Sequence, residues 1–284
     1  MKPAPAAANT AATEPSPWRS ANQPLHAVTA SLPAPSPGAH GQLRERGLDL
    51  VKWLALASMV LDHLRFLLPG QPLLAWCFVP GRLAFPLFCL ALAANLARQR
   101  PGVFARTAQR HIGGLLLFAA LSEPAHDLLL GNTHKFNILI SLALGWGIAW
   151  GLHARRLGPL LLAVLLLLGA AWLRSRLTYG LPGVLLPSLC LQALQRGGPW
   201  PALATLTVLL ANFTPRLGAA LLAGQPRDWL IVASCLAALP LGLWLLHAPL
   251  PPRLRIPAVG RWAYFFYPLH MLAIAAAAAL LRAS

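Results

Sequence analysis

Residues 48–68 form an apolar stretch that keeps four ionisable side chains, the first candidates for chemistry. Asp49, Lys52, Asp62 and His63 interrupt a run long enough to cross a bilayer as one helix. Ionisable groups at membrane depth are costly, so they usually line a functional site. On a helix of about 100° per residue, Lys52 and His63 share one face about 16 Å apart, whereas Asp62 points about 100° away from His63. The alternative is that these charges lie at the two headgroup boundaries.

The next apolar stretch carries an arginine between helix-breaking residues. Pro80-Gly81 precedes Arg82 and Pro86 follows one turn later, so backbone carbonyls there lose their helical partners. An unwound, arginine-bearing stretch at membrane depth normally lines a cavity. Arg82 then either extends its long stem to a headgroup or holds an anion, which is a phosphate, a substrate carboxylate or a side chain such as Asp62.

A third polar group consists of Glu123, His126 and Asp127, whose spacing places them on one helix face. Two carboxylates and a histidine make a formal set of metal ligands. No other cluster with comparable spacing accompanies them, so we expect no metal and interpret the group as a polar cap or as part of a substrate site. Asn137 opens the following apolar stretch and can hydrogen-bond between helices.

Two further candidates for substrate or donor binding stand near the starts of later apolar stretches. Tyr179 precedes a Gly-Leu-Pro-Gly segment at 180–183. His270 follows Tyr267 by three residues in a stretch rich in alanine and leucine. A lone histidine on an apolar face is more often a packed, hydrogen-bonded group than a catalyst, so we expect a smaller role for His270 than for His63.

The composition indicates a membrane protein. Of 284 residues, 57% are hydrophobic and 11% are charged, and the mean hydropathy is +0.60. These values predict an all-α, polytopic bundle. The net charge of +16 arises from bases between apolar stretches, where they meet anionic lipid, so membrane lipids are expected partners and nucleic acid is not.

The chain divides into two parts at residue 47. Residues 1–47 are dominated by Ala, Pro, Ser, Thr and Asn and lack hydrophobic periodicity, which predicts a disordered tail. Residues 48–284 alternate apolar stretches with short loops, which predicts about nine (eight to ten) transmembrane helices. The expected spans are 48–68, 73–97, 108–130, 136–153, 158–173, 179–195, 199–222, 228–247 and 262–281.

The bases divide unevenly between the two sides of these spans. Fourteen Lys and Arg residues fall on the side of the N-terminal tail and seven on the other, with Lys52 and Arg82 inside spans. The richer side is expected to be cytoplasmic. We therefore expect a multi-pass protein of the inner membrane with a cytoplasmic N-terminus, and His63 near the outer face.

These stretches, taken in order, resemble the TraX/TrbP family of membrane proteins. The pieces that carry the resemblance lie in register over most of residues 48–284. They are Leu-Asp-Leu-Val-Lys with Leu-Asp-His at 48–63, Gly-Arg-Leu-Ala-Phe-Pro-Leu-Phe at 81–88, Leu-Ser-Glu-Pro with Asp at 121–127, Asn-Ile-Leu-Ile-Ser-Leu-Ala-Leu-Gly at 137–145, Tyr-Gly-Leu-Pro-Gly-Val-Leu at 179–185 and Tyr-Pro-Leu-His at 267–270. The chain departs from the family pattern at Thr178, where an Asp is common, and at Ala94-Asn95, where Glu-Gly is common.

The resemblance implies a fold similar to that of the acyltransferase-3 superfamily and a membrane acetyltransferase. The implied reaction is N-acetylation of a conjugative pilus subunit with acetyl-coenzyme A as cosubstrate. His63 would act as general base or transient acyl carrier, Arg82 would stabilise negative charge or hold a donor phosphate, and Asp62 would orient one of them. Alternatives are a lipid or polysaccharide O- or N-acyltransferase, or a non-enzymatic transporter or assembly component of an envelope machine.

Overall fold

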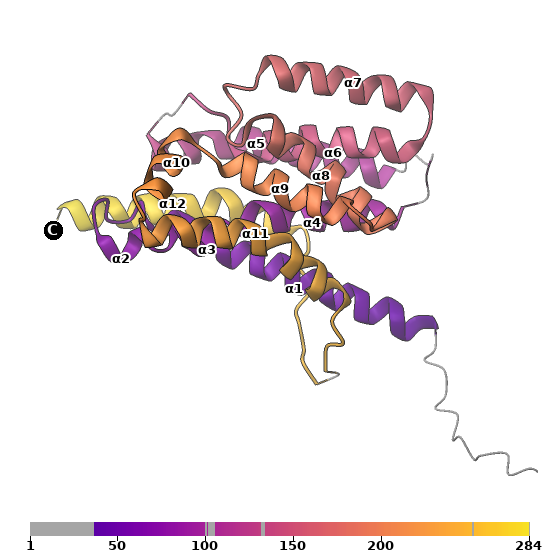
Figure 1. Ribbon diagram of the computed structural model, residues 1–284, viewed down its shortest axis with the longest axis horizontal. Coiled ribbons are helices and arrows are strands. Elements are labelled where there is room, and N and C mark those ends of the chain that lie inside the picture. The colour runs from indigo at the N-terminus through magenta and orange to yellow at the C-terminus, as the bar shows by residue number, and fades with distance from the viewer. Residues whose placement is uncertain (1–36, 100, 102–105, 132–133, 252, 284) are drawn as a thin grey trace, which may run out of the picture.

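The chain folds as helices joined by short turns and loops. A computed structural model describes residues 37–99, 101, 106–131, 134–251 and 253–283 (Figure 1). In these ranges there is no strand, only one isolated bridge between Phe136 and Leu177. The helices are α1 (Pro37–Leu64), α2 (Pro72–Ala75), α3 (Phe78–Gly81), α4 (Ala84–Ala97), α5 (Arg106–Leu130), α6 (Ile138–Ala154), α7 (Leu157–Trp172), α8 (Gly180–Arg196), α9 (Trp200–Asn212), α10 (Pro215–Leu222), α11 (Pro226–His247) and α12 (Trp262–Ala283).

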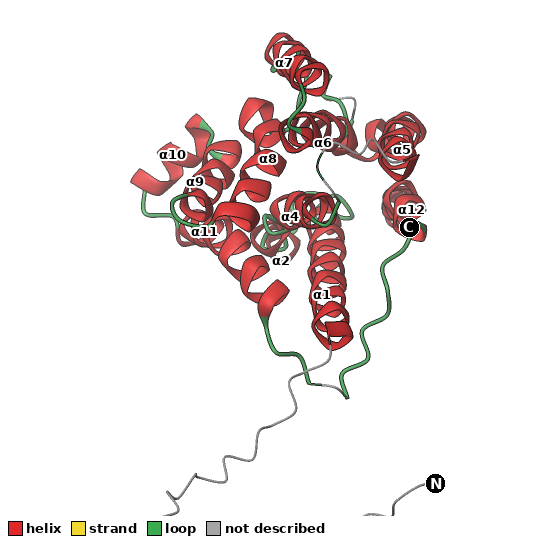
Figure 2. Ribbon diagram, turned by 90° about the vertical axis from the view of Figure 1, so that its right-hand side faces the viewer, coloured by secondary structure: helices red, strands yellow, loops and turns green. Residues whose placement is uncertain are grey.

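Helix α4 lies at the centre of the bundle, with α1, α8 and α11 around it and α7 at the periphery (Figure 2). Its sequence is apolar on every side, which is the pattern of a helix that is surrounded by protein. Leu87, Cys89, Leu90 and Leu96 are accordingly inaccessible to solvent. Helices α5 and α12 pair with each other beside this core.

The outer surface of the bundle is also apolar, as expected for a protein that faces lipid. Large side chains on the peripheral helices are exposed, among them Leu165 and Leu168 of α7, Leu117 of α5 and Leu210 of α9. A water-soluble chain rarely leaves so much contiguous apolar surface uncovered. The all-α membrane bundle predicted from composition is therefore confirmed.

Each predicted span contains at least one helix, but the count of nine crossings stays a prediction. By length and composition, four helical segments within the described ranges can cross a membrane, and up to five if one bent pair is a single span. The four segments are Pro72–Ala97, Gln109–Leu130, Pro226–His247 and Trp262–Ala283. The bent pair, α9 and α10, turns by 95°. Pro215 stops the first helix there, and the Thr214 hydroxyl accepts a hydrogen bond from the Leu217 amide to start the second.

Helix α1 begins earlier than the predicted boundary between tail and spans. It starts at Pro37, so residues 37–47, which were expected to belong to the disordered tail, are helical. This segment contains Gln, Leu, Arg and Glu, which are good helix formers. The rest of the predicted tail, residues 1–36, lies outside the described residues.

Candidate functional site

Asp62 and Arg82 form a buried ion pair between α1 and the turn after α3. The Arg82 Nη2 atom lies 2.5 Å from Asp62 Oδ1, and Arg82 is only 8% exposed. The broken helix predicted around Pro80-Gly81 is present, because α3 ends at Gly81 and α4 begins at Ala84. Of the partners considered for Arg82, the carboxylate side chain is therefore the one found.

Arg82 also links two helices from the second half of the chain. Its Nη1 atom donates to Asn212 Oδ1 at 3.0 Å and lies 3.4 Å from Tyr179 Oη, while the guanidinium packs 3.8 Å from the centre of the Phe78 ring. The Tyr179 ring stacks on Phe85 of α4, with centroids 4.3 Å apart. The position of this cation is thus fixed from several directions.

His63 pairs with His270, although 207 positions separate them. His63 Nδ1 lies 2.7 Å from His270 Nε2, and His270 Nδ1 lies 2.8 Å from the Phe266 carbonyl oxygen. A carbonyl oxygen only accepts, so a neutral His270 carries its proton on Nδ1 and accepts with Nε2. The bond to His63 must then be donated by His63 Nδ1, which leaves the lone pair of His63 Nε2 without a hydrogen-bond partner in the described part of the chain. His270 therefore orients His63 and selects its tautomer.

His63 faces a large polar cavity, called here the His63 cavity. It has a volume of about 770 Å³, and both the Asp62–Arg82 pair and Tyr179 line it. Arg65, Arg216, Arg227, Asp228 and His126 also contribute side chains to its wall. His63 and Asp62 are neighbours in sequence but have separate partners, as their predicted 100° offset on the helix requires.

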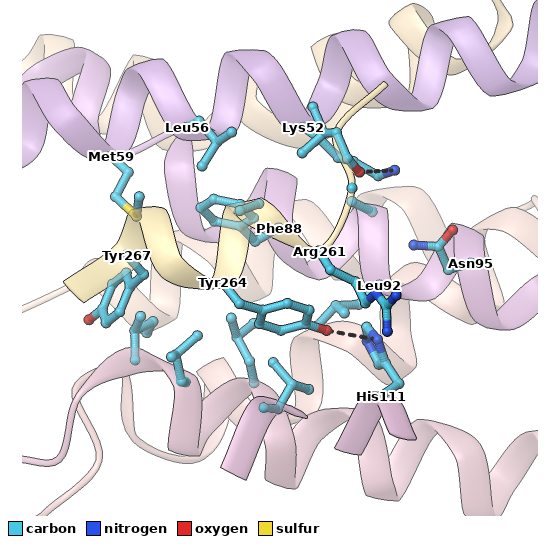
Figure 3. Close-up of a pocket in the computed structure, with 18 residues that line it drawn as sticks. Lys52, Leu56, Met59, Phe88, Leu92, Asn95, His111, Arg261, Tyr264 and Tyr267 are labelled. Carbon is cyan, nitrogen blue, oxygen red and sulfur yellow. Dashed lines mark hydrogen bonds between the residues drawn. The ribbon is translucent and has the colours of Figure 1, made fainter. Parts of the chain in front are cut away.

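A second cavity, called the Lys52 cavity, has a volume of about 340 Å³ and is lined by α1, α4, α5, α6 and α12 (Figure 3). Lys52, Asn95, His111 and Arg261 gather toward one end of it, and Met59 and Tyr267 lie toward the other. Most of the lining between these ends is apolar. The polar end is thus separated from the His63 cavity by an apolar segment.

The two cavities adjoin one another. Met59, Phe88, Ile138 and Tyr267 line both of them. Because Lys52 and His63 lie on one face of α1, about 16 Å of helix axis separates the polar end of one cavity from the histidine in the other. At these shared lining residues, a long, thin ligand could extend from one cavity into the other.

Lys52, toward the polar end of its cavity, is held by two contacts. Its Nζ atom lies 2.9 Å from Asp49 Oδ1 and donates to the Val259 carbonyl oxygen at 3.4 Å. Asp49 also accepts from the Val259 amide at 3.2 Å. These bonds fasten α1 to the segment that precedes α12.

Glu123 and Asn137, two candidates for substrate binding, join α5 to α6. The Glu123 carboxylate accepts from the side-chain and backbone nitrogens of Asn137, and Asn137 Nδ2 also donates to the Ala119 carbonyl oxygen at 2.7 Å. Asn137 Oδ1 caps α6 by accepting from the Leu139 amide. Neither Glu123 nor Asn137 lines either cavity, so their contacts support a structural role.

The formal metal-ligand set is compact but partly engaged. One ligand atom from each of Glu123, His126 and Asp127 lies within 4.8 Å of the others. Asn137 already binds the Glu123 carboxylate, and Asp127, another substrate-site candidate, lies outside both cavities with His126 Nδ1 3.6 Å away. A cation would have to compete for Glu123, and the expectation of no metal stays a prediction.

Sequence reasoning did not select several residues of the His63 cavity. Asn212 had a signal, since it is an amide within an apolar stretch, but Arg216 and Arg227 were counted only among the bases on the base-poor side. The two departures from the family pattern also lie at the cavities. Thr178 lines the His63 cavity and Asn95 the Lys52 cavity.

The fold and site together define a helical membrane protein with a histidine-bearing polar cavity inside its bundle. The chain belongs to the TraX family, whose family model, described as TraX protein, matches residues 47–277. Protein TraX of Escherichia coli is 30% identical to it over 163 residues, 57% of this chain and 62% of that protein. Protein TraX of Escherichia coli strain K12 is 30% identical over 138 residues, 49% of this chain and 52% of that protein. The chain thus spans less than two thirds of these relatives, and no solved structure matches it.

Proposed function

We propose that this protein is an integral membrane acetyltransferase that moves an acetyl group from acetyl-coenzyme A to an amine or hydroxyl in the His63 cavity. The observation that carries the proposal is the pair of histidines. His270 holds His63 with the Nε2 lone pair free, beside the Asp62–Arg82 ion pair. A base oriented by a second group next to a fixed cation is the arrangement that acyl transfer needs.

In this mechanism His63 Nε2 takes the proton of the acceptor as the acceptor attacks the thioester carbonyl carbon. The carbon–sulfur bond breaks, the acetyl group stays on the acceptor, and the proton passes from the His63 imidazolium to the leaving thiolate of coenzyme A. The Arg82 Nε–H is buried and has no partner among the described residues, so it is a donor for the developing oxyanion. Asp62 and Asn212 hold the guanidinium in place.

We further propose that acetyl-coenzyme A reaches the site through the Lys52 cavity. Coenzyme A is cytoplasmic, and the uneven base count favours an inner-membrane orientation in which the N-terminus and the Lys52 end of α1 face the cytoplasm. Lys52 and Arg261 would meet the donor's phosphates, and the apolar middle of the cavity would take the pantetheine arm. Its thioester would then lie near Tyr267, where the two cavities adjoin.

Two acceptors are in view. The family resemblance implies the N-terminal amine of a conjugative pilin subunit, which would make the role one in conjugation. A phosphate-bearing lipid is the second, because Arg65, Arg216 and Arg227 line the same cavity as His63. The non-enzymatic alternative assigns the cavities to transport or to assembly of an envelope machine.

Intact-mass analysis of envelope peptides, lipids and glycans, with and without the protein, tests the proposal. We expect one class of molecule to lose a mass equal to an acetyl group when the protein is absent. Identical masses in all three classes would contradict the acetyltransferase and favour the non-enzymatic role.

A further inference from the structure

Three arginines that the proposed transfer step does not use converge on the His63 cavity. Arg65 follows α1, Arg216 lies in the first turn of α10 and Arg227 lies in the first turn of α11. None of the three forms an ion pair with any residue in the described ranges of the chain. The Nε–H of Arg65 is moreover buried without a hydrogen-bond partner there.

The cavity therefore carries an excess of positive charge. Arg82 is neutralised by Asp62, which leaves Asp228 as the carboxylate that offsets the other three arginines among the cavity's lining residues. Like charges that share a partly desolvated cavity repel one another, and a bound anion relieves this repulsion. Guanidinium groups are suited to phosphate, because their planar fork donates two parallel hydrogen bonds.

The location of these arginines has no topological explanation. Arg65, Arg216 and Arg227 are three of the seven bases on the base-poor side of the chain. The positive-inside rule favours bases on the opposite side, so these three need another reason. Two guanidiniums, those of Arg65 and Arg82, also pack on one ring, 4.3 Å and 3.8 Å from the centre of Phe78, which restrains them at the cavity wall.

The surface beside the cavity is that of a lipid interface. Trp76, Phe213 and Trp229 belong to the segments that supply cavity residues, and each is about half exposed. Exposed aromatic side chains next to charged groups are typical of the headgroup level of a bilayer. An anion that reaches this cavity is thus most simply the headgroup of a lipid from the adjoining leaflet.

We propose that the acceptor is a phosphate-bearing anionic lipid, held by Arg65, Arg216 and Arg227 with its hydroxyl or amine at His63. The new bond joins the acetyl carbon to the lipid oxygen or nitrogen, the thioester carbon–sulfur bond breaks, and the acceptor proton passes through His63 to the coenzyme A sulfur. This assignment rests on the proposed acetyl transfer for its chemistry. Recognition of the headgroup is a separate property that can be measured without turnover.

Lipid binding to the purified full chain tests the assignment. Phosphatidylglycerol and phosphatidylcholine are compared by native mass spectrometry of the protein released from mixed micelles, with inorganic pyrophosphate as the soluble probe. We expect phosphatidylglycerol to bind about tenfold or more tightly than phosphatidylcholine, because both lipids carry a phosphodiester but phosphatidylcholine adds a quaternary ammonium, which the excess positive charge of the cavity repels. The Arg216→Gln/Arg227→Gln variant should lose this preference.

A matched control separates the cavity from the general charge of the protein. Arg253→Gln/Arg255→Gln removes two exposed bases outside both cavities and should keep the preference. Equal binding of the two lipids, equal loss in both double variants, or pyrophosphate binding as tight as that of phosphatidylglycerol would each overturn the lipid assignment. His63→Ala should keep the lipid preference and lose acetyl transfer, because lipid binding and transfer depend on different residues. If the wild-type protein binds the lipid selectively but transfers no acetyl group, the proposed enzyme is contradicted and the lipid site is not.

Discussion

At the scale of residues, the site consists of two pairs that start from adjacent positions of α1. His63 turns toward His270 of α12, while Asp62 turns toward Arg82 after α3. The first pair presents a free imidazole nitrogen and the second presents a fixed cation. The two pairs have distinct proposed roles, so we expect substitutions in the histidine pair to lower the rate of acetyl transfer and substitutions in the ion pair to lower both the rate and the thermal stability.

The first prediction concerns His270. His270→Ala removes the acceptor that holds the Nδ1 proton of His63, so His63 can rotate and take either tautomer. We expect kcat for acetyl transfer to fall about 10-fold to 100-fold, by analogy with other partners that orient a histidine, and KM for acetyl-coenzyme A to change little. This is a larger effect than the sequence alone suggested for a packed histidine.

His270→Gln is the matched variant, because its side-chain oxygen can still accept from His63. Steady-state kinetics should show it recovering a substantial part of the loss seen with alanine. A glutamine variant as slow as the alanine variant would mean that His270 only fills space.

The second prediction concerns Arg82. Arg82→Lys keeps the charge but removes the fork that spans Asp62 and Asn212, as well as the Nε–H. We expect acetyl transfer to fall about 100-fold or more and thermal unfolding in detergent to occur at a lower temperature, because a lysine cannot bridge Asp62 and Asn212, and a hydrogen bond to a charged group contributes about 1.5–3 kcal/mol. Transfer at the wild-type rate would show that charge alone suffices and that the directional bonds do not matter.

Some of this site could be predicted from residue types alone. Charges inside apolar stretches need partners, and this requirement pointed to Asp62 and Arg82. Nothing in the sequence signals that two lone histidines 207 positions apart will meet, because that contact depends on how α12 packs beside α1. The sequence analysis counted Arg216 and Arg227 only among the bases of the base-poor side, because nothing in the sequence shows that the starts of α10 and α11 meet at one cavity.

At the scale of elements, the interrupted segment α2–α4 brings the arginine to α1. Gly81 ends α3 directly against Asp62, and a Cβ there would lie 2.7 Å from the Asp62 Cβ and Oδ1 atoms and 2.9 Å from its Cα. No real side chain tolerates such distances, so the two segments can approach this closely only at a glycine. The helix is interrupted between Gly81 and Ala84, while Pro86 lies in the first turn of α4, and Gly81 sets how closely the broken segment approaches α1.

The third prediction follows from this contact. Gly81→Ala should separate α3 from α1, displace Asp62 from Arg82 and reduce acetyl transfer at least about tenfold, with a lower melting temperature. Gly113→Ala is the control, because Gly113 lies in α5 and a Cβ added there would meet no atom within 4 Å. That variant should melt at the wild-type temperature or slightly above it. Similar behaviour of both variants would remove the packing argument.

At the scale of the whole molecule, the two adjoining cavities lie along α1, one toward each end of the helix. In the proposed reaction the Lys52 cavity would take the donor at one end of α1, and the His63 cavity would take the acceptor toward the other end. The fold class could be predicted from composition, because a membrane bundle has both an apolar core and an apolar surface and therefore needs an unusually high share of hydrophobic residues. The start of α1 was harder to predict, since the helix begins at Pro37 and continues across the change from polar to apolar residues at Leu48.

The fourth prediction concerns orientation. Reporter fusions within 98–110 and within 248–261 should both report the cytoplasm, because these loops hold many of the bases on the richer side. A fusion in the loop between the first two predicted spans, within 69–72, should report the opposite side. Placement of either loop outside would reverse the entry side of acetyl-coenzyme A and leave the Lys52 cavity without a donor.

The central claim, that His63 is the base of an acetyl transfer, is tested most directly by labelled acetyl-coenzyme A. Membranes that contain equal amounts of the wild-type protein or of His63→Ala are supplied with the label, and acetyl incorporation into lipid and protein is measured per molecule of enzyme. We expect incorporation with the wild type and a loss of at least about 100-fold with the variant. Equal incorporation per molecule by His63→Ala would contradict the account.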